Sequence, residues 1–171
     1  MSTAILLGTA RNGGNTHQLA HHIADRASAQ VFDLADYIIC PYDYSHNNSG
    51  DDFLPLMREV LRFDNIVLAS PIYWYSPSSA MKVFLDRWSD LLTIEKGLGR
   101  QLRQKSGAVI ATGANAVLTP CFEEIFQLTY NYLGMQYKGI LYCACEEDIL
   151  HPQHLLHSFA MDDFVRKLHA G

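Results

Sequence analysis

The chain has 171 residues, of which 49% are hydrophobic and 18% charged, and its formal net charge is −5. This balance predicts one globular domain over residues 1–171 and argues against nucleic acid or an anionic membrane as the main partner. No apolar run approaches the roughly 18 residues of a transmembrane helix, so we expect no membrane insertion. Without a leader pattern or a Cys-x-x-Cys pair, we expect a cytoplasmic protein with reduced thiols.

The first quarter of the chain predicts a buried strand, a helix and a second strand. Ala4–Gly8 is apolar throughout, and Thr16–Ser28 carries apolar residues at helical spacing with Asn15 as the expected N-cap. Ala29–Leu34 is a weaker strand. The polar, tyrosine-rich segment Ala35–Gly50 is long for a loop, which is typical of function or mobility.

The next stretch predicts a helix, a strand and a helix. Asp51 and Asp52 suit the start of a helix, because acidic residues favour that end. Its apolar face carries Phe53, Leu56, Met57, Val60 and Leu61. Asn65–Ser70 is apolar as a covered parallel strand should be, and it leads into the loop Pro71–Pro77. The following helix has the apolar stripe Met81, Phe84, Leu85, Trp88, Leu91 and Leu92.

The C-terminal part continues the alternation. Thr93–Lys105 has two glycines and four basic residues and is expected to be a surface connection. Gly107–Gly113 and Gly139–Cys145 are expected strands, with a helix between them that starts at Pro120 and stops near Gly134. Pro152–His169 is expected to form a closing helix with Leu155, Phe159, Val165 and Leu168 on its apolar face.

Strands that alternate with helices predict an α/β fold in which a parallel sheet is covered by helices on both faces. In such sheets, ligands bind at the carboxyl ends of the strands. Three distinctive loops follow apolar strands: Thr9–Asn15, Pro71–Pro77 and Gly113–Thr119. We therefore expect these loops to meet at one edge of the sheet.

The first of these loops has the composition of a monophosphate site. It combines the hydroxyls of Thr9 and Thr16, the amide of Asn15, the guanidinium of Arg11 and a helix N-terminus. It lacks both the lysine of a P-loop and the Gly-x-Gly-x-x-Gly pattern of dinucleotide sites. A plain glycine turn before a capped helix is the alternative, but that alternative does not account for Arg11.

The second loop places Tyr73, Trp74 and Tyr75 in succession. Three consecutive aromatic side chains cannot all point into the core, so some should lie exposed or cover a flat ligand such as an isoalloxazine ring. An aromatic cluster at an oligomer interface is the alternative.

These motifs resemble the flavodoxin-like superfamily, and within it the NAD(P)H-dependent FMN reductase (NAD(P)H:quinone oxidoreductase-like) family. Gly8-Thr9-Ala10-Arg11…Asn15-Thr16 is similar to the phosphate loop of that family, with threonine in place of the usual serine. Ser70–Trp74 and Ala80–Arg87 resemble its flavin loop and the helix after it, and Asp51-Asp52 resembles its acidic pair. The resemblance implies a three-layer fold with a five-stranded parallel sheet of order 2-1-3-4-5.

The resemblance also implies a cofactor, a reaction and a set of contacts. The cofactor is FMN and the co-substrate NAD(P)H. Hydride would pass to flavin N5 and then to a quinone, a flavin or a similar small acceptor. A homodimer is implied as well, and no catalytic side chain is named. The cofactor-binding residues would be Thr9, Arg11, Gly14, Asn15 and Thr16 for the phosphate, and Pro71, Ile72, Tyr73, Trp74, Thr112 and Gly113 for the ring.

The alternative function is a flavodoxin-type electron carrier between protein partners, although a net charge of −5 is modest for that class. Iron–sulfur members of the family carry several cysteines in the loop where this chain has only Cys40, so no cluster is expected in that loop. We expect no metal site either. His17 and His21 continue into Asp25 on one polar helix face, and His151, His154 and His157 have no cysteine beside them.

Overall fold

The computed structural model describes residues 1–145 and 155–170. Its core is a sheet with the strand order β2-β1-β3-β5-β6, all parallel. These five strands follow the expected order 2-1-3-4-5. A sixth strand, β4, is a short antiparallel addition to β3. The strands are β1 (Thr3–Leu7), β2 (Gln30–Asp33), β3 (Asn65–Tyr73), β4 (Ser76–Pro77), β5 (Ser106–Gly113) and β6 (Gln136–Ala144).

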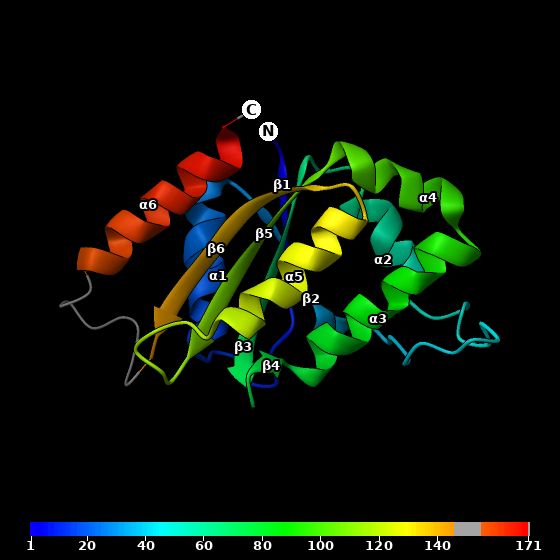
Figure 1. The fold of residues 1–171 in the computed structure, drawn as a ribbon, viewed down its shortest axis with the longest axis horizontal. Coiled ribbons are helices and arrows are strands. Elements are labelled where there is room, and N and C mark those ends of the chain that lie inside the picture. Colours follow the sequence, from blue (N-terminus) through cyan, green and yellow to red (C-terminus); the bar gives the residue numbers. More distant parts are fainter. Residues whose placement is uncertain (146–154, 171) are drawn as a thin grey trace.

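Helices cover both faces of the sheet (Figure 1). Because side chains alternate along a strand, Ile5 and Leu7 of β1 join one core while Ala4 and Leu6 join the other. The first core lies under α1 (Asn15–Ala27) and α6 (Leu155–His169), and the second under α2 (Phe53–Val60), α3 (Ser79–Thr93) and α5 (Pro120–Tyr132). The three-layer flavodoxin-like fold is therefore confirmed.

The segment Thr93–Lys105, expected to be a surface connection, is mostly exposed and links α3 to β5, but it is helical, which the sequence did not indicate. It forms α4 (Lys96–Gln101) and the 3₁₀ turn η2 (Leu102–Gln104); a similar 3₁₀ turn, η1 (Leu34–Asp36), follows β2. Leu102 is fully buried, and a Cβ on Gly99 would lie 2.1 Å from the Leu91 carbonyl oxygen. The two glycines therefore do not mark a loop, since one of them permits close packing of α4 against α3.

Two apolar residues expected in the core are exposed. Leu92 at the end of α3 is 43% exposed and Phe159 of α6 is 74% exposed, while Met161 and Phe164 provide the buried face of α6. The side chain of Leu155 and the segment from Pro152 to His154 lie outside the described part of the chain. Within the described residues, no helix is long and apolar enough to cross a membrane.

Candidate functional site

The loop between β1 and α1 is shaped by local hydrogen bonds. The Arg11 N–H donates to Thr9 Oγ1 (3.3 Å), and the Gly14 N–H donates to the Arg11 carbonyl oxygen (3.3 Å). Gly13 has φ +70°, a conformation that glycine adopts without strain. A Cβ on Gly14 would lie 3.3 Å from Cγ and Cδ of Arg11, so the Arg11 stem lies against this glycine. The Arg11 side chain therefore passes close to the start of α1, and the residue is exposed.

The start of α1 differs from the expectation. Gly14, not Asn15, is the N-cap, and Asn15 is the first helical residue. Burial raises the pKa of the Cys145 thiol and the nearby Asn15 side chain lowers it in part, while the thiol itself donates to the Cys143 carbonyl oxygen (3.5 Å). The first turn of α1 contains no acidic residue, so its free N–H groups face no negative charge within the helix.

Two hydroxyl contacts tie this loop to the neighbouring strands. Thr16 Oγ1 lies 2.6 Å from Thr112 Oγ1, and both side chains are buried. Ser78 donates its hydroxyl to the Gly8 carbonyl oxygen (2.6 Å) and accepts the Met81 N–H as the N-cap of α3. Three loops from distant parts of the sequence are thereby fixed at one edge of the sheet, as expected.

The aromatic segment is a hairpin rather than an open loop. β3 runs on to Tyr73, where it pairs with Ser76 of β4. Trp74 and Tyr75 form the two-residue turn, with φ values of 51° and 64°. Bulky residues rarely adopt this left-handed conformation, which a two-residue turn of this kind requires. Their side chains are 93% and 57% exposed, and Tyr73 is 46% exposed, so the turn presents three aromatic rings to solvent.

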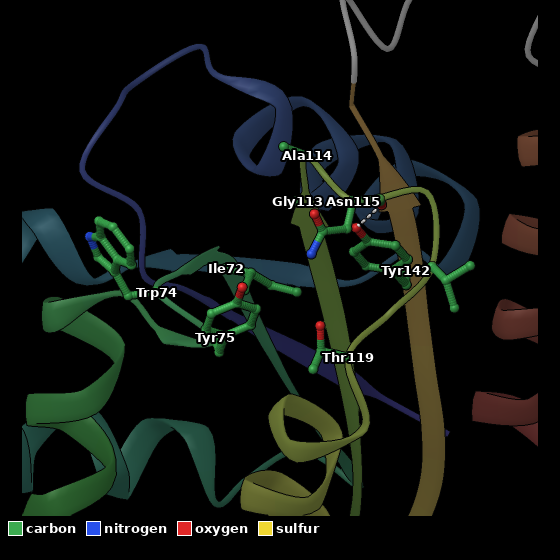
Figure 2. A pocket seen from close by; sticks show the side chains of 9 residues that line it. Ile72, Trp74, Tyr75, Gly113, Ala114, Asn115, Thr119 and Tyr142 are labelled. Carbon is green, nitrogen blue, oxygen red and sulfur yellow. Dashed lines mark hydrogen bonds between the residues drawn. The ribbon is translucent and has the colours of Figure 1, made fainter.

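A hollow of about 350 Å³ lies between this hairpin and the loop after β5 (Figure 2). The β1–α1 loop arches over the same edge of the sheet. Tyr142 of β6 forms part of one wall, and its hydroxyl donates to the Asn115 carbonyl oxygen. Burial raises the pKa of Tyr142, so its hydroxyl remains a donor at neutral pH. The hollow is lined by Ile72, Trp74, Tyr75, Gly113, Ala114, Asn115, Val117, Thr119 and Tyr142.

Three of the eleven residues predicted to bind the cofactor line this hollow: Ile72, Trp74 and Gly113. Pro71, Tyr73 and Thr112 are their sequence neighbours, and the other five lie at the β1–α1 loop. The sequence prediction did not include Tyr75 or the lining residues beyond Gly113. The loop Gly113–Thr119, which follows an apolar strand, could have indicated most of them. Tyr142 lies inside the strand β6, where nothing in the sequence distinguishes it from its neighbours.

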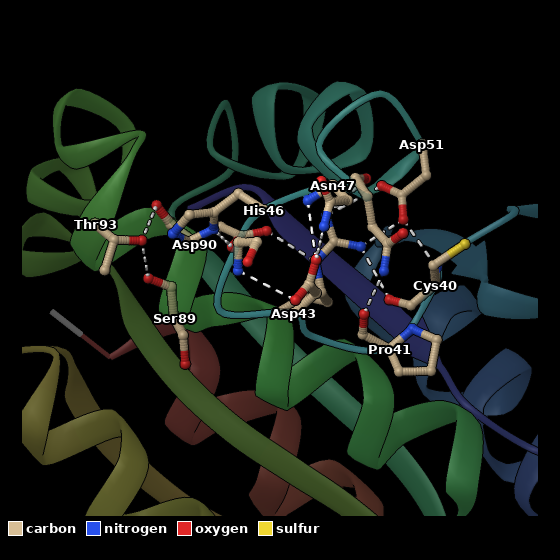
Figure 3. Close-up of polar contacts among 12 residues, drawn as sticks. Cys40, Pro41, Asp43, His46, Asn47, Asp51, Ser89, Asp90 and Thr93 are labelled. Atoms are coloured by element: carbon tan, nitrogen blue, oxygen red, sulfur yellow. Dashed lines mark hydrogen bonds and ion pairs between the residues drawn. The ribbon is translucent and has the colours of Figure 1, made fainter.

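The long loop from Tyr37 to Asp52 is held to α3 by a buried ion network, part of which is shown in Figure 3. Arg87 is 1% exposed. It forms ion pairs with Asp51 and Asp90 and donates to the carbonyl oxygens of Cys40 (2.9 Å) and Asn48 (3.3 Å). Nδ1 of His46, which belongs to the loop, lies 2.9 Å from Oδ1 of Asp90. This loop is therefore anchored to the scaffold.

The cysteines form no disulfide: Cys40, Cys121, Cys143 and Cys145 are all free. Burial raises the pKa of Cys143 to about 12, so this thiol stays protonated at neutral pH. In the described residues, no group of three histidine, cysteine, aspartate or glutamate side chains is placed to hold a metal ion. His151 and His154, and the side chain of His157, lie outside that description.

Residues 1–145 match the family model of the NADPH-dependent FMN reductases. The chain belongs to this family. A relative from Bacillus subtilis (strain 168), YwqN, is 32% identical over 153 residues, which cover 81% of this chain and 82% of YwqN. YwqN is named as an NAD(P)H-dependent FMN-containing oxidoreductase. This member of the family is accordingly an FMN-dependent NAD(P)H oxidoreductase.

Solved structures agree on the fold. The Trp repressor binding protein from Bacillus subtilis superposes with a TM-score of 0.75 at 24% identity, covering 99% of this chain and 98% of that protein. The FMN-dependent NADH-azoreductase of Bacillus anthracis (strain Ames Ancestor), solved in complex with FMN, superposes with a TM-score of 0.68 at 11% identity. The superposition covers 98% of this chain and 100% of the azoreductase. Likeness at these identities supports the flavodoxin-like architecture of this FMN reductase.

Proposed function

We propose that this family member holds FMN across the carboxyl edge of its sheet, with the phosphate on the β1–α1 loop and the ring in the hollow. The exposed Arg11 guanidinium beside the start of α1 carries the proposal, because it places a cation and free N–H groups at one point. Phosphate contacts come from Thr9, Arg11, Gly14, Asn15 and Thr16, and ring contacts from Pro71, Ile72, Tyr73, Trp74, Thr112 and Gly113.

The described side chains fit such a group. A hollow of about 350 Å³ lies within the usual range for small-ligand sites, and flat aromatic side chains form one side of it. At Gly113 the opposite wall is bare backbone, where a Cβ would lie 3.0 Å from the Tyr142 hydroxyl oxygen. If Thr112 donates the bond that joins the two hydroxyls, the Thr16 hydroxyl can still donate to the phosphate, and the Thr16 backbone N–H at the start of α1 offers a second donor.

Bound FMN supplies the redox chemistry by taking a hydride from NAD(P)H and passing reducing equivalents to an acceptor. The chain's own part is to hold and shield the ring. Trp74 and Tyr75 can exclude water from one side of the hollow and offer faces on which a flat acceptor stacks. We therefore propose a quinone, a free flavin or a similar planar molecule as the acceptor.

We also propose that the protein works as a homodimer in the cytoplasm. Exposed large apolar side chains on several elements support the dimer, since such residues are more often covered by a partner. Four free thiols are in keeping with a reducing compartment.

Anaerobic mixing of the FMN-loaded protein with NADPH, and separately with NADH, tests this function. We expect rapid direct bleaching of the flavin absorbance band with at least one of the two, and reoxidation when a quinone is added. An electron carrier of the flavodoxin type would keep its oxidised spectrum with both. A protein that is neither yellow when purified nor able to bind added FMN would contradict the proposal altogether.

A further inference from the structure

The buried hydroxyls of Thr16 and Thr112 meet at the edge of the sheet where we place the FMN site. Thr16 is the second residue of α1 and Thr112 is the last but one of β5, so the contact joins positions 96 residues apart. The two Oγ1 atoms lie 2.6 Å apart, and the residues are 3% and 4% exposed. This hydroxyl pair links the start of α1 to the strand whose next residue, Gly113, lines the flavin hollow (Figure 2).

One proton of the hydroxyl pair has no acceptor in the described part of the chain. A threonine hydroxyl carries one proton and can accept two hydrogen bonds. The contact between the two hydroxyls uses one of their two protons, and neither Oγ1 atom makes a further hydrogen bond with a described residue. A buried hydroxyl proton without an acceptor is costly. The second proton therefore favours an acceptor that binds from outside the chain.

The positions of the two side chains indicate which proton remains available. Along β5, Ala108 and Ile110 belong to the core under α1, so Thr112, two residues further on, faces the same side of the sheet. That core consists of largely apolar side chains, which offer little to a hydroxyl proton. Thr16 instead lies in the first turn of α1, where the free N–H groups of the helix favour an anion. A bond donated by Thr112 to Thr16 leaves the second proton at that anion site.

We propose that Thr112 is a positioning residue for the FMN phosphate and acts through Thr16. The Thr112 hydroxyl donates to Thr16 Oγ1, and the Thr16 hydroxyl donates to a phosphate oxygen. Hydrogen bonds in such a chain strengthen one another, because each bond polarises the next. The inference rests on the FMN site proposed above and adds a side chain that acts on the phosphate without touching it. Because this side chain faces α1, the ring contact proposed for Thr112 is made by its backbone.

Titration of the apoprotein with FMN and with riboflavin, which lacks the phosphate, tests the role of Thr112. Thr112→Val keeps the shape of the side chain and removes its proton. We expect this variant to bind FMN roughly threefold to tenfold more weakly, the scale of one neutral hydrogen bond, and to bind riboflavin nearly as the wild type does. Thr112→Ser keeps the hydroxyl and should retain most of the preference for FMN. An equal loss of affinity for both ligands, or no loss for either, would overturn the proposal.

Thr3→Val is the matched control. Thr3 is 1% exposed, and its hydroxyl accepts a hydrogen bond from Asn65 Nδ2 (3.1 Å) at the opposite end of the parallel strands. The variant should lower the free energy of unfolding, measured with urea, yet keep the wild-type ratio of FMN to riboflavin affinity. A ratio that falls as far in Thr3→Val as in Thr112→Val would mean that lost stability, not lost positioning, causes the change. If Thr112→Val does not fold, Thr112→Ala and Thr112→Ser give the same comparison, since only serine retains the proton.

A double-mutant cycle tests whether Thr112 acts through Thr16. Thr16→Val should weaken FMN binding at least as much as Thr112→Val does. The double variant should bind FMN no more weakly than Thr16→Val alone, because the chain of hydrogen bonds is already broken. Losses that multiply in the double variant would show that the two hydroxyls act independently and would contradict the proposal.

Salt separates the hydroxyl pair from Arg11. The Arg11 side chain is charged and exposed, so its contribution to FMN binding is screened by salt. The hydroxyl pair is neutral and buried, so the loss caused by Thr112→Val should stay the same between about 0.05 M and about 0.5 M salt, while the loss caused by Arg11→Ala shrinks. Equal shrinkage of the two losses would contradict a neutral, buried contact.

Failure of this inference and failure of the FMN site give different results. A wild-type protein that binds neither FMN nor riboflavin would contradict the proposed function itself. A protein whose preference for FMN falls in Arg11→Ala but is unchanged in Thr112→Val would overturn only the role of Thr112.

Discussion

Two arginines, Arg87 on α3 and Arg11 in the β1–α1 loop, have contrasting surroundings. Arg87 is buried, and each of its guanidinium nitrogens donates to a described partner, with the Phe53 ring 4.8 Å below it. Arg11 is exposed, and its guanidinium makes no hydrogen bond or ion pair with any residue in the described segments. The first arginine is fully hydrogen-bonded within the fold, whereas the second makes no such bond to the described residues, in line with the phosphate contact proposed for it.

The two loops differ in the same way. The long loop from Tyr37 to Asp52 resembles a functional segment in sequence, yet its polar groups turn inward to Arg87 and to its own backbone. The shorter β1–α1 loop and the Trp74–Tyr75 turn keep their polar groups and rings outward. Loop length alone therefore does not indicate a binding site. The proposal for the β1–α1 loop and the Trp74–Tyr75 turn is based instead on polar groups and rings that face solvent.

The largest expected effect comes from Arg87. Arg87→Met leaves the buried carboxylates of Asp51 and Asp90 without their cation, which should lower the free energy of unfolding by about 3–5 kcal/mol. Urea titration of the apoprotein measures this change. Arg58→Met is the control, since it removes only the more exposed pair with Glu95 and should cost less than about 1 kcal/mol. Equal losses in the two variants would contradict a structural role for the buried Arg87 network.

Arg11 should show the reverse behaviour. Arg11→Ala should weaken FMN binding by about 1.5–3 kcal/mol, the scale of a charge-assisted hydrogen bond. The unfolding free energy of the apoprotein should change by less than about 0.5 kcal/mol, because the side chain is exposed. Fluorescence titration with FMN and urea unfolding measure the two quantities. Unchanged FMN affinity would count against the phosphate assignment.

We expect the residues of the aromatic turn to lower the stability of the protein and to contribute to FMN binding or turnover. Replacing Trp74-Tyr75 by Asn-Gly gives the turn residues that its positive φ angles favour and should raise the free energy of unfolding by about 1–2 kcal/mol. FMN binding or turnover with a quinone should fall, because the exposed rings are lost. A variant that is no more stable than the wild type would show that the turn carries no strain.

The smallest expected effect is on how the free energy of unfolding depends on pH in the acid range. Burial raises the pKa of Asp51, but the bonds from Arg87 and from the Cys40 and Phe53 N–H groups outweigh it, and the net pKa is lowered. A carboxyl whose folded pKa is lowered stabilises the fold above its unfolded pKa of about 3.9, and that contribution is lost as pH falls through the folded value. Asp51→Asn should therefore flatten the acid limb of the stability curve. Parallel wild-type and variant curves below pH 4 would contradict this.

Much of this structure follows from local patterns. Apolar runs predicted four of the five main strands and a weaker pattern predicted β2, and the loops that follow three of these strands meet at one edge of the sheet, as the sequence predicted. The errors came from long-range packing. Gly99 permits a helix to pack against α3, and Phe159 faces solvent. The ion pair between Arg87 and Asp51, for which the sequence made no prediction, likewise joins residues 36 positions apart. No periodicity encodes these contacts, and for the same reason Tyr142 was missed.

The most direct test compares FMN with riboflavin, which lacks the phosphate. Titrating both ligands into the wild type and Arg11→Ala gives the contribution of the phosphate to binding in each protein. We predict that Arg11→Ala lowers the affinity for FMN about 10-fold or more and leaves the affinity for riboflavin nearly unchanged, so that the preference for FMN is lost. An equal loss of affinity for the two ligands would mean that Arg11 does not bind the phosphate.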